Sequence, residues 1–345
     1  MSLKDLTKVS DGCYSLSMQT LNLSTHCLEC LENMVLKLQS FEARKLFSGV
    51  TESLRAAPKF LLPDGGRVME DENSVSRLYD QMRLPFACVA LEYEAHGAID
   101  VSIETRSSKR IALCWDLSQG VPAYLQNVLG CDSSPRKTLA VQSLSFLDDH
   151  KTWLPIMGLL TIDLDEPIVK GTVAQHTKTS PEFVDLTKHR FKEQRASTLV
   201  SSFSMKVHPY LAEELTAPLS DERNIANLSA DSSDELLAMI SFAALTSCAN
   251  VEFDVVPAVK MLNKKRAAKG KEPFYDVRVL MLSGQGYQGS TQSGGASAGA
   301  AGHASPRTHL RRGHVRRLPE KNVWVNASVI NASAERARTP SYKLV

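Results

Sequence analysis

This sequence has few aromatic residues, no long apolar run and almost no excess of charge. Phe, Trp and Tyr make up only 6% of its 345 residues, so little surface is available for stacking nucleobases. The absence of a run of about 18 apolar residues excludes a conventional membrane-spanning helix. The formal net charge is only +2, so the chain lacks a globally basic footprint, and binding of an anionic partner would depend on a local patch.

The seven cysteines are scattered and odd in number, which excludes a regular disulfide framework and is typical of a cytosolic protein with free thiols. Cys27 and Cys30 follow His26, but a zinc site needs four ligands and no second pair occurs at matching spacing. We therefore interpret both cysteines as packing residues of a helix. Because the first residues lack the apolar core of a signal peptide, we expect a cytoplasmic protein with no cofactor and no membrane contact.

The spacing of apolar residues predicts an α+β protein, with a mostly antiparallel sheet, N-terminal helices, one buried helix and a C-terminal cationic β-hairpin. The expected divisions are an N-terminal helical region at 1–83, an α+β core at 84–282, a flexible Gly/Ser/Ala loop at 283–305, a cationic hairpin at 306–331 that joins the core, and a tail at 332–345. The loop has too little apolar surface to order itself.

Apolar residues at three- and four-residue steps favour helix from about residue 24 to 57, with a break near Gly49. The core strands that we expect are 85–93, 101–105, 110–117, 138–147, 158–164, 199–207, 251–256 and 274–282. Ser107, Ser108 and Lys109 would form a hairpin turn between two of these strands.

The best-specified helix begins at Ser232. Ser232 and Glu235 have the spacing of a capping box, in which the acidic side chain turns back to the start of the helix. Wide apolar coverage from Leu236 to Leu245 predicts that this helix is deeply packed.

One stretch near the C-terminus is chemically distinct. Residues 307–317 contain five arginines and two histidines, namely Arg307, Arg311, Arg312, Arg316 and Arg317 with His309 and His314. Alternate residues of a strand point to opposite faces, so the two histidines would lie on different faces. A turn at 319–322 and a returning strand at 323–330 complete a hairpin, which we expect to join strand 274–282.

Several functions suit this stretch. Packed arginines repel one another unless an anion lies among them, and their planar forks suit the oxygens of RNA or DNA phosphates. A metal-independent endoribonuclease would use His309 and His314 for proton transfer, although on opposite faces one of them would need a partner from elsewhere. The structural alternative is a solvated edge that blocks strand pairing or pairs with the chain's own carboxylates.

A second basic segment lies at 260–271, where six positive residues occur without an acid. It includes Lys264, Lys265, Arg266 and Lys269. Such point charges would give non-specific, salt-sensitive affinity for phosphates, and a solvated loop is the alternative. The aromatic residues nearest to the two basic segments are Tyr275, Tyr287 and Trp324, too few to support sequence-specific reading of a single strand.

Asp163, Asp165 and Glu166 cluster at the end of a strand, where carboxylates can hold Mg²⁺ or Ca²⁺. The fixed glycine and glutamate of a calcium loop are missing. A solvated turn, or neutralisation of the C-terminal arginines, explains these acids equally well, and we assign no metal site.

The pattern His-x-Arg-Arg-Gly-His-x-Arg-x-Leu at 309–318, followed by a turn and Trp-Val, resembles the C-terminal signature of an uncharacterised family that is widespread among bacteriophages, prophages and plasmids. The basic run at 263–273 and the strand after it are also similar, so the resemblance covers residues 245–330. The long insert between the two motifs departs from the compact pattern. The resemblance implies a phage source and a bacterial host cytoplasm, and it implies no mechanism.

The sequence thus favours a phage-derived cytoplasmic protein that binds nucleic acid, RNA more than DNA, through the Arg/His-rich strand and the lysines. The endoribonuclease is one alternative. Another is a non-enzymatic host-takeover or anti-defence inhibitor whose arginines bind an acidic host protein. Whether the protein is an enzyme stays open at this point.

Overall fold

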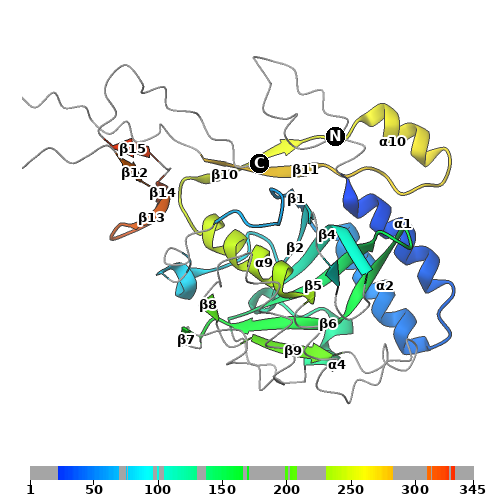
Figure 1. Ribbon diagram of the computed structural model, residues 1–345. Helices are drawn as coiled ribbons and strands as arrows, with labels where there is room; N and C mark the ends of the chain where they lie inside the picture. The colour runs from blue at the N-terminus through cyan, green and yellow to red at the C-terminus, as the bar shows by residue number, and fades with distance from the viewer. Residues whose placement is uncertain are drawn as a thin grey trace, which may run out of the picture.

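The structure, a computed structural model, describes residues 22–69, 75, 77–95, 99–100, 105–129, 137–165, 169–170, 199–200, 203–207, 231–282, 309–311, 313–325 and 328–330 (Figure 1). It confirms the α+β class with a mainly antiparallel sheet and a C-terminal hairpin. The loop at 283–305 and the tail at 332–345 lie outside the described residues.

The helices are α1 (Leu23–Val35), α2 (Phe41–Ala56), α4 (Ala123–Leu129), α9 (Ser233–Thr246) and α10 (Lys260–Ala267), with the 3-10 turns η3 (Tyr79–Gln81) and η4 (Leu117–Gln119). The main sheet contains β1 (Lys59–Leu61), β2 (Cys88–Glu94), β3 (Ile99–Asp100), β4 (Thr105–Asp116), β5 (Thr138–Leu147), β6 (Thr152–Asp163), β9 (Phe203–Val207), β10 (Val251–Val256) and β11 (Val277–Leu282). The remaining strands are β7 (Val169–Lys170), β8 (Leu199–Val200), β12 (His309–Arg311), β13 (His314–Arg317), β14 (Asn322–Val325) and β15 (Ser328–Ile330).

The main sheet is mixed, with the order β10-β11-β1-β2-β4-β5-β6-β9 and β3 added to β4. β1 runs parallel to both of its neighbours, β11 and β2, whereas the other pairs are antiparallel. β10 is therefore the outermost strand at one edge of this sheet.

Helices cover both faces of the sheet, α9 on one and α1 with α2 on the other (Figure 1). The side chains of β4 point alternately to the two faces of the sheet, so each face has an apolar surface for helices to cover. Ala112 and Cys114 pack into the core under α9, whereas Ile111 and Leu113 pack under α1 and α2. A strand that is buried on both faces is apolar at consecutive positions, as β4 is here.

The predicted break of the N-terminal helix at Gly49 is wrong. The chain leaves the helical conformation between α1 and α2, where Ser40 starts α2 by accepting a hydrogen bond from the N–H of Ala43 (3.2 Å). Gly49 lies inside α2, and a Cβ there would be 2.3 Å from Cγ of Tyr124. This glycine therefore permits the close approach of α2 and α4.

The predicted turn at 107–109 is also wrong, because β4 continues through it. The register between β4 and β5 shifts between Ser107 and Lys109, which leaves Ser108 as the extra residue of a bulge. The hydroxyl of Ser108 donates a hydrogen bond to Asp148 (2.6 Å).

A fully buried ion pair joins α9 to the sheet. Nη1 of Arg110 on β4 lies 3.2 Å from Oε1 of Glu235 on α9, and both side chains have no exposed surface. The carboxylate also accepts hydrogen bonds from the hydroxyls of Tyr93 (2.8 Å) and Ser143 (3.0 Å). Arg110 donates a further bond to the carbonyl of Asp231 (2.8 Å). The charges are therefore paired and hydrogen-bonded, as burial requires.

This ion pair overturns the capping-box prediction. Ser232 makes no side-chain cap, and Glu235 turns toward the sheet. Burial and the nearby Glu235 carboxylate raise the pKa of Tyr93 well above its usual value, so the phenol keeps its proton and serves as a donor.

The hairpin does not join strand 274–282, contrary to expectation. β11 already lies between β10 and β1, and among the described residues the hairpin strands pair with one another, β12 with β15 and β13 with β14. The hairpin instead contacts the core through the side chains of Val315 and Trp324 and through a hydrogen bond from the N–H of Ala249 to the carbonyl of Asn322 (2.9 Å). In the described part of the chain, none of the helices has both the length and the apolar character needed to cross a membrane.

Arg110→Met and Glu235→Gln should each lower the free energy of unfolding by about 3–5 kcal/mol, because each leaves one buried charge without its partner. The double variant should lose clearly less than the sum of the two. Urea denaturation followed by circular dichroism measures all three. Arg44→Met, at an exposed arginine, is the control and should change stability by no more than about 0.5 kcal/mol. Strict additivity of the two buried substitutions would show that the pair is not coupled.

Candidate functional site

The cationic hairpin forms as its alternation predicts. His314 lies opposite Val325 and Arg317 opposite Asn322, and β12 with β15 continues the same register. The turn is closed by the N–H of Leu318, which donates to the carbonyl of Lys321 (2.8 Å). The sequence therefore places the turn and both strands correctly.

One face of the hairpin rests on the core. Val315 is 1% exposed and packs into the core under α9, beside its cross-strand neighbour Trp324. Gly313 makes room for the indole, because a Cβ at this position would be 2.7 Å from Cζ2 of Trp324. The Asn250 amide then holds the backbone of Trp324 from both sides, donating to its carbonyl (3.0 Å) and accepting from its N–H (2.8 Å).

Arg316 and Arg317 are exposed near the tip of the hairpin. Arg317 lies 3.7 Å from Asp80, but the two side chains are 55% and 66% exposed, so water screens this pair. Of the other predicted residues, the structure describes the half-buried His314, only the backbone of His309 and Arg311, and neither Arg307 nor Arg312.

His309 lies on β12 and His314 on β13, and Arg312 between these strands lies outside the described residues. The two histidines lie five positions apart in the register of the hairpin, and the side chain of His309 lies outside the described residues. An acid and a base that act on one phosphodiester must both come within about 3 Å of its reacting oxygens. Because the structure describes the side chain of only one of the two histidines, the two-histidine ribonuclease stays a prediction.

The second basic segment forms α10, which is anchored through its inward side. The guanidinium of Arg266 pairs with Glu29 on α1 and lies over the ring of Phe274, 4.4 Å from its centroid. Asn263 donates to the carbonyl of Phe274 (2.8 Å) and accepts from its N–H (2.7 Å). Arg266 thus holds the helix in place, and we no longer count it among the phosphate-binding candidates.

The loop after α10 is fixed by a second ion pair. Nε of Arg55 on α2 lies 3.1 Å from Oε1 of Glu272. Burial acts to raise the pKa of Glu272, but hydrogen bonds from Arg55 and Tyr275 lower it overall. Nearby, burial lowers the pKa of Lys59 to about 8, and its ammonium lies 3.8 Å from the centroid of the Tyr275 ring. These contacts anchor the loop after α10 to α2 and β1.

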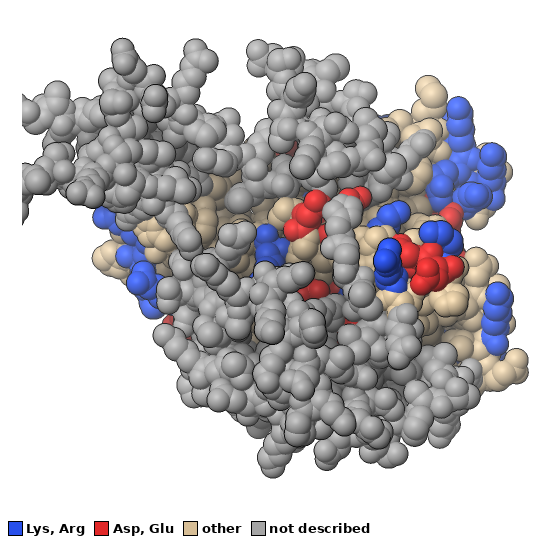
Figure 2. Space-filling view, in the orientation of Figure 1, with Lys and Arg blue, Asp and Glu red and all other residues tan. Residues whose placement is uncertain are grey.

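The outward side of α10, together with the segment just after the helix, forms a lysine face. We use this name for Lys260, Lys264, Lys265, Lys269 and Lys271, all of which are exposed. No carboxylate of the described residues lies within ion-pairing distance of any of them. Figure 2 shows basic side chains gathered where α10 projects, and more at the opposite end of the molecule, by the hairpin.

β10 lies between the lysine face and the hairpin. Its first residue follows Asn250, which holds the hairpin, and its last residue leads into α10 (Figure 1). Glu252 and Asp254 are exposed along this strand. Sequence reasoning overlooked these two acids and Asn250. The alternation of acidic and apolar residues in 251–256, directly before a basic segment, was the available signal.

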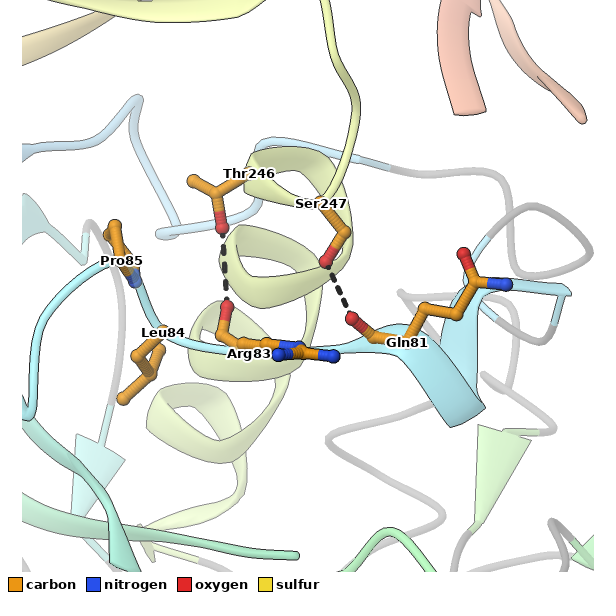
Figure 3. A pocket seen from close by; sticks show the side chains of 6 residues that line it. All are labelled: Gln81, Arg83, Leu84, Pro85, Thr246 and Ser247. Atoms are coloured by element: carbon orange, nitrogen blue, oxygen red, sulfur yellow. Dashed lines mark hydrogen bonds between the residues drawn. The ribbon is translucent and has the colours of Figure 1, made fainter. Parts of the chain in front are cut away.

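A pocket of about 430 Å³ opens beside the hairpin, at the C-terminal end of α9 (Figure 3). It is lined by Gln81, Arg83, Leu84, Pro85, Thr246 and Ser247. The two hydroxyls serve the fold, because Thr246 donates to the carbonyl of Arg83 (3.5 Å) and Ser247 to that of Gln81 (3.1 Å). Among the described residues that line the pocket there is no carboxylate, imidazole or thiol.

Among the described residues, no group of three or more potential metal ligands occurs. Asp163 accepts a hydrogen bond from the N–H of Asp165 (2.9 Å), and Asp165 lies 4.0 Å from the ammonium of Lys137. Glu166 is outside the described residues. In α1, Cys27 is fully buried, which confirms its predicted role in packing.

Comparison with protein-family models, curated proteins and solved structures finds no match for this chain. The resemblance of residues 245–330 to a phage-borne family therefore stays a prediction.

Gly313→Ala should loosen the hairpin, because the added methyl displaces Trp324 from its place on the core. We expect a cost of about 1–3 kcal/mol, as for other overpacked sites. Trypsin should then cleave faster after Arg316 and Arg317, and mass spectrometry of the fragments over time measures this rate. Glu320→Ala, in the exposed turn, is the matched control and should leave the cleavage rate unchanged. Identical cleavage of the Gly313→Ala variant and the unsubstituted protein would contradict the packing described for Trp324.

Proposed function

We propose that this protein binds nucleic acid, RNA in preference to DNA, through phosphate contacts made by α10 and the C-terminal hairpin. One observation carries the proposal. The lysine face presents five ammonium groups, three on the short helix α10 and two just after it, and no described carboxylate neutralises them. Such a concentration of positive charge is stabilised when an anion with closely spaced charges binds to it.

The distribution of basic residues supports this reading. Arg55, Arg110 and Arg266 are paired with carboxylates and hold elements together. The lysines of α10 are not used in this way, although the net charge of the chain is only +2. Flexible ammonium groups in water are suited to contacting a phosphate backbone without reading its sequence.

The hairpin supplies a second set of contacts through Arg316 and Arg317. The weak pairing of Arg317 with Asp80 leaves its guanidinium available to a phosphate, which is a better bidentate partner. Since Val315 and Trp324 fix the hairpin to the core, these arginines are presented from a defined position. A defined position reduces the entropy lost on binding.

The context that we propose is a bacterial cytoplasm, where a phage-borne protein would meet RNA. Free thiols support this placement. Cys27, Cys30, Cys88, Cys114 and Cys248 are all unbonded to one another.

A second candidate is an acidic host protein as the partner of the same helix. Exposed apolar side chains next to the lysines favour it, because Val255, Val259 and Met261 are 46%, 45% and 69% exposed. A protein interface uses such side chains at its centre, whereas a phosphate backbone does not need them.

Lys264→Gln/Lys265→Gln/Lys269→Gln should weaken RNA binding by about tenfold or more at low salt, since three phosphate contacts are lost. The slope of log affinity against log salt should fall by about two to three units. Fluorescence anisotropy with a labelled RNA across a salt series measures both quantities.

The matched control removes the same charge elsewhere, by Lys37→Gln/Lys45→Gln/Lys137→Gln at exposed positions. It should keep the unsubstituted affinity and slope. Equal losses in the two triple variants would show that net charge, and not α10, governs binding. Absence of binding by the unsubstituted protein at low salt would end the proposal.

Met261→Gln separates the two candidates, because it removes an apolar contact and leaves every charge in place. If nucleic acid is the partner, RNA affinity should be unchanged. If an acidic protein is the partner, capture of that protein from nuclease-treated bacterial lysate should fall while RNA affinity stays negligible.

A further inference from the structure

The aromatic rings near the two basic regions face the protein. Trp324 packs on the core over Gly313, and the ring of Tyr275 lies under the ammonium of Lys59 while its hydroxyl donates to Glu272. Within the described parts of α10, its following loop and the hairpin, therefore, no Phe, Tyr or Trp side chain is exposed for stacking on a base. Proteins that hold single strands depend on such stacking. Binding of nucleic acid by these two regions would therefore depend on contacts to the phosphate backbone.

The two basic regions are also separated. β10, whose six residues span about 20 Å, lies between them. Glu252 and Asp254 are exposed along this strand, so a single strand that followed it closely would bring phosphates against carboxylates. A partner that fits must offer phosphates at two separate places and something other than phosphate between them.

A double helix has this property, because its two phosphate ridges are separated by a groove. The phosphates of one ridge can contact the lysine face while those of another ridge contact Arg316 and Arg317. The carboxylates of β10 then face the groove between the ridges. In RNA the wide, shallow minor groove displays 2′-hydroxyls, which donate hydrogen bonds to carboxylates. DNA has no such donors at these positions.

We propose that the partner is double-stranded RNA lying along the β10 edge of the sheet, with the lysine face at one end, Arg316 and Arg317 at the other, and Glu252 and Asp254 on 2′-hydroxyls between them. This inference rests on the proposed function and names its substrate class. The interaction is governed by the shape and spacing of the backbone, so the base sequence has little influence.

The test compares four labelled probes by anisotropy at low salt. They are a duplex RNA of about 16 base pairs, a stem of about 6 base pairs closed by a stable loop, the corresponding single strand and the corresponding DNA duplex. The long RNA duplex should bind about tenfold or more tightly than each of the others, since only it reaches both basic regions and offers 2′-hydroxyls.

Three sets of substitutions test whether the duplex contacts the lysine face, the hairpin arginines and the acids of β10. Lys264→Gln/Lys265→Gln/Lys269→Gln and Arg316→Gln/Arg317→Gln should each reduce the affinity for the long duplex toward that of the short stem. Glu252→Gln/Asp254→Asn should raise the affinity for the DNA duplex more than that for the RNA duplex. The ratio of RNA affinity to DNA affinity should therefore fall. A merely structural role of these acids would leave the ratio unchanged.

The outcomes are distinguishable. No binding of any probe would overturn the proposed function itself. Equal binding of single strand and duplex, or of short and long duplex, would leave the function standing and overturn the double-helix inference. Equal binding of the RNA and DNA duplexes, with an unchanged ratio in the Glu252→Gln/Asp254→Asn variant, would overturn the role of the 2′-hydroxyls.

Discussion

The buried ion pair of Arg110 and Glu235 is the interaction on which the rest of this structure depends. Removing two charges from water costs several kcal/mol each, and the attraction between them offsets this only when their other bonding positions are satisfied. Tyr93, Ser143 and the carbonyl of Asp231 supply several of these bonds here. The pair therefore fixes one end of α9 against β4 in a single position.

The placement of the hairpin follows from that of α9. The last turn of the helix holds the segment at 81–85 through Thr246 and Ser247. Just beyond this turn, Asn250 grips the backbone of Trp324, and the N–H of Ala249 donates to the carbonyl of Asn322 (2.9 Å). A helix fixed at its first turn thus carries the docking site of the hairpin at its other end. α10 depends on a separate set of contacts with α1 and α2, so the two basic regions are positioned independently of each other.

The sequence predicts the elements whose signals are local. The α+β class, β5, β10 and the hairpin turn follow from alternation and turn residues over a few positions. What it misses depends on distant partners. Glu235 has perfect capping-box spacing, yet its charge is needed by Arg110, 125 residues away in the chain. An arginine directly before the apolar run of β4 was a usable sign that a buried acid exists.

The candidate site shows the same limit. Five arginines in eleven residues identify the C-terminal stretch, but they do not reveal that Val315 and Trp324 dock one face of it on the core. In the lysine segment, composition cannot separate Arg266, which pairs with Glu29, from its exposed neighbours. To predict either feature, one must know which face of the hairpin or of α10 packs against another part of the protein.

Lysine acetylation followed by mass spectrometry, with and without saturating duplex RNA, tests the central claim most directly. The account predicts that RNA protects Lys260, Lys264, Lys265 and Lys269 several-fold, whereas Lys37, Lys45 and Lys137 react equally in both states. Unchanged reactivity of the α10 lysines while RNA is bound would contradict it.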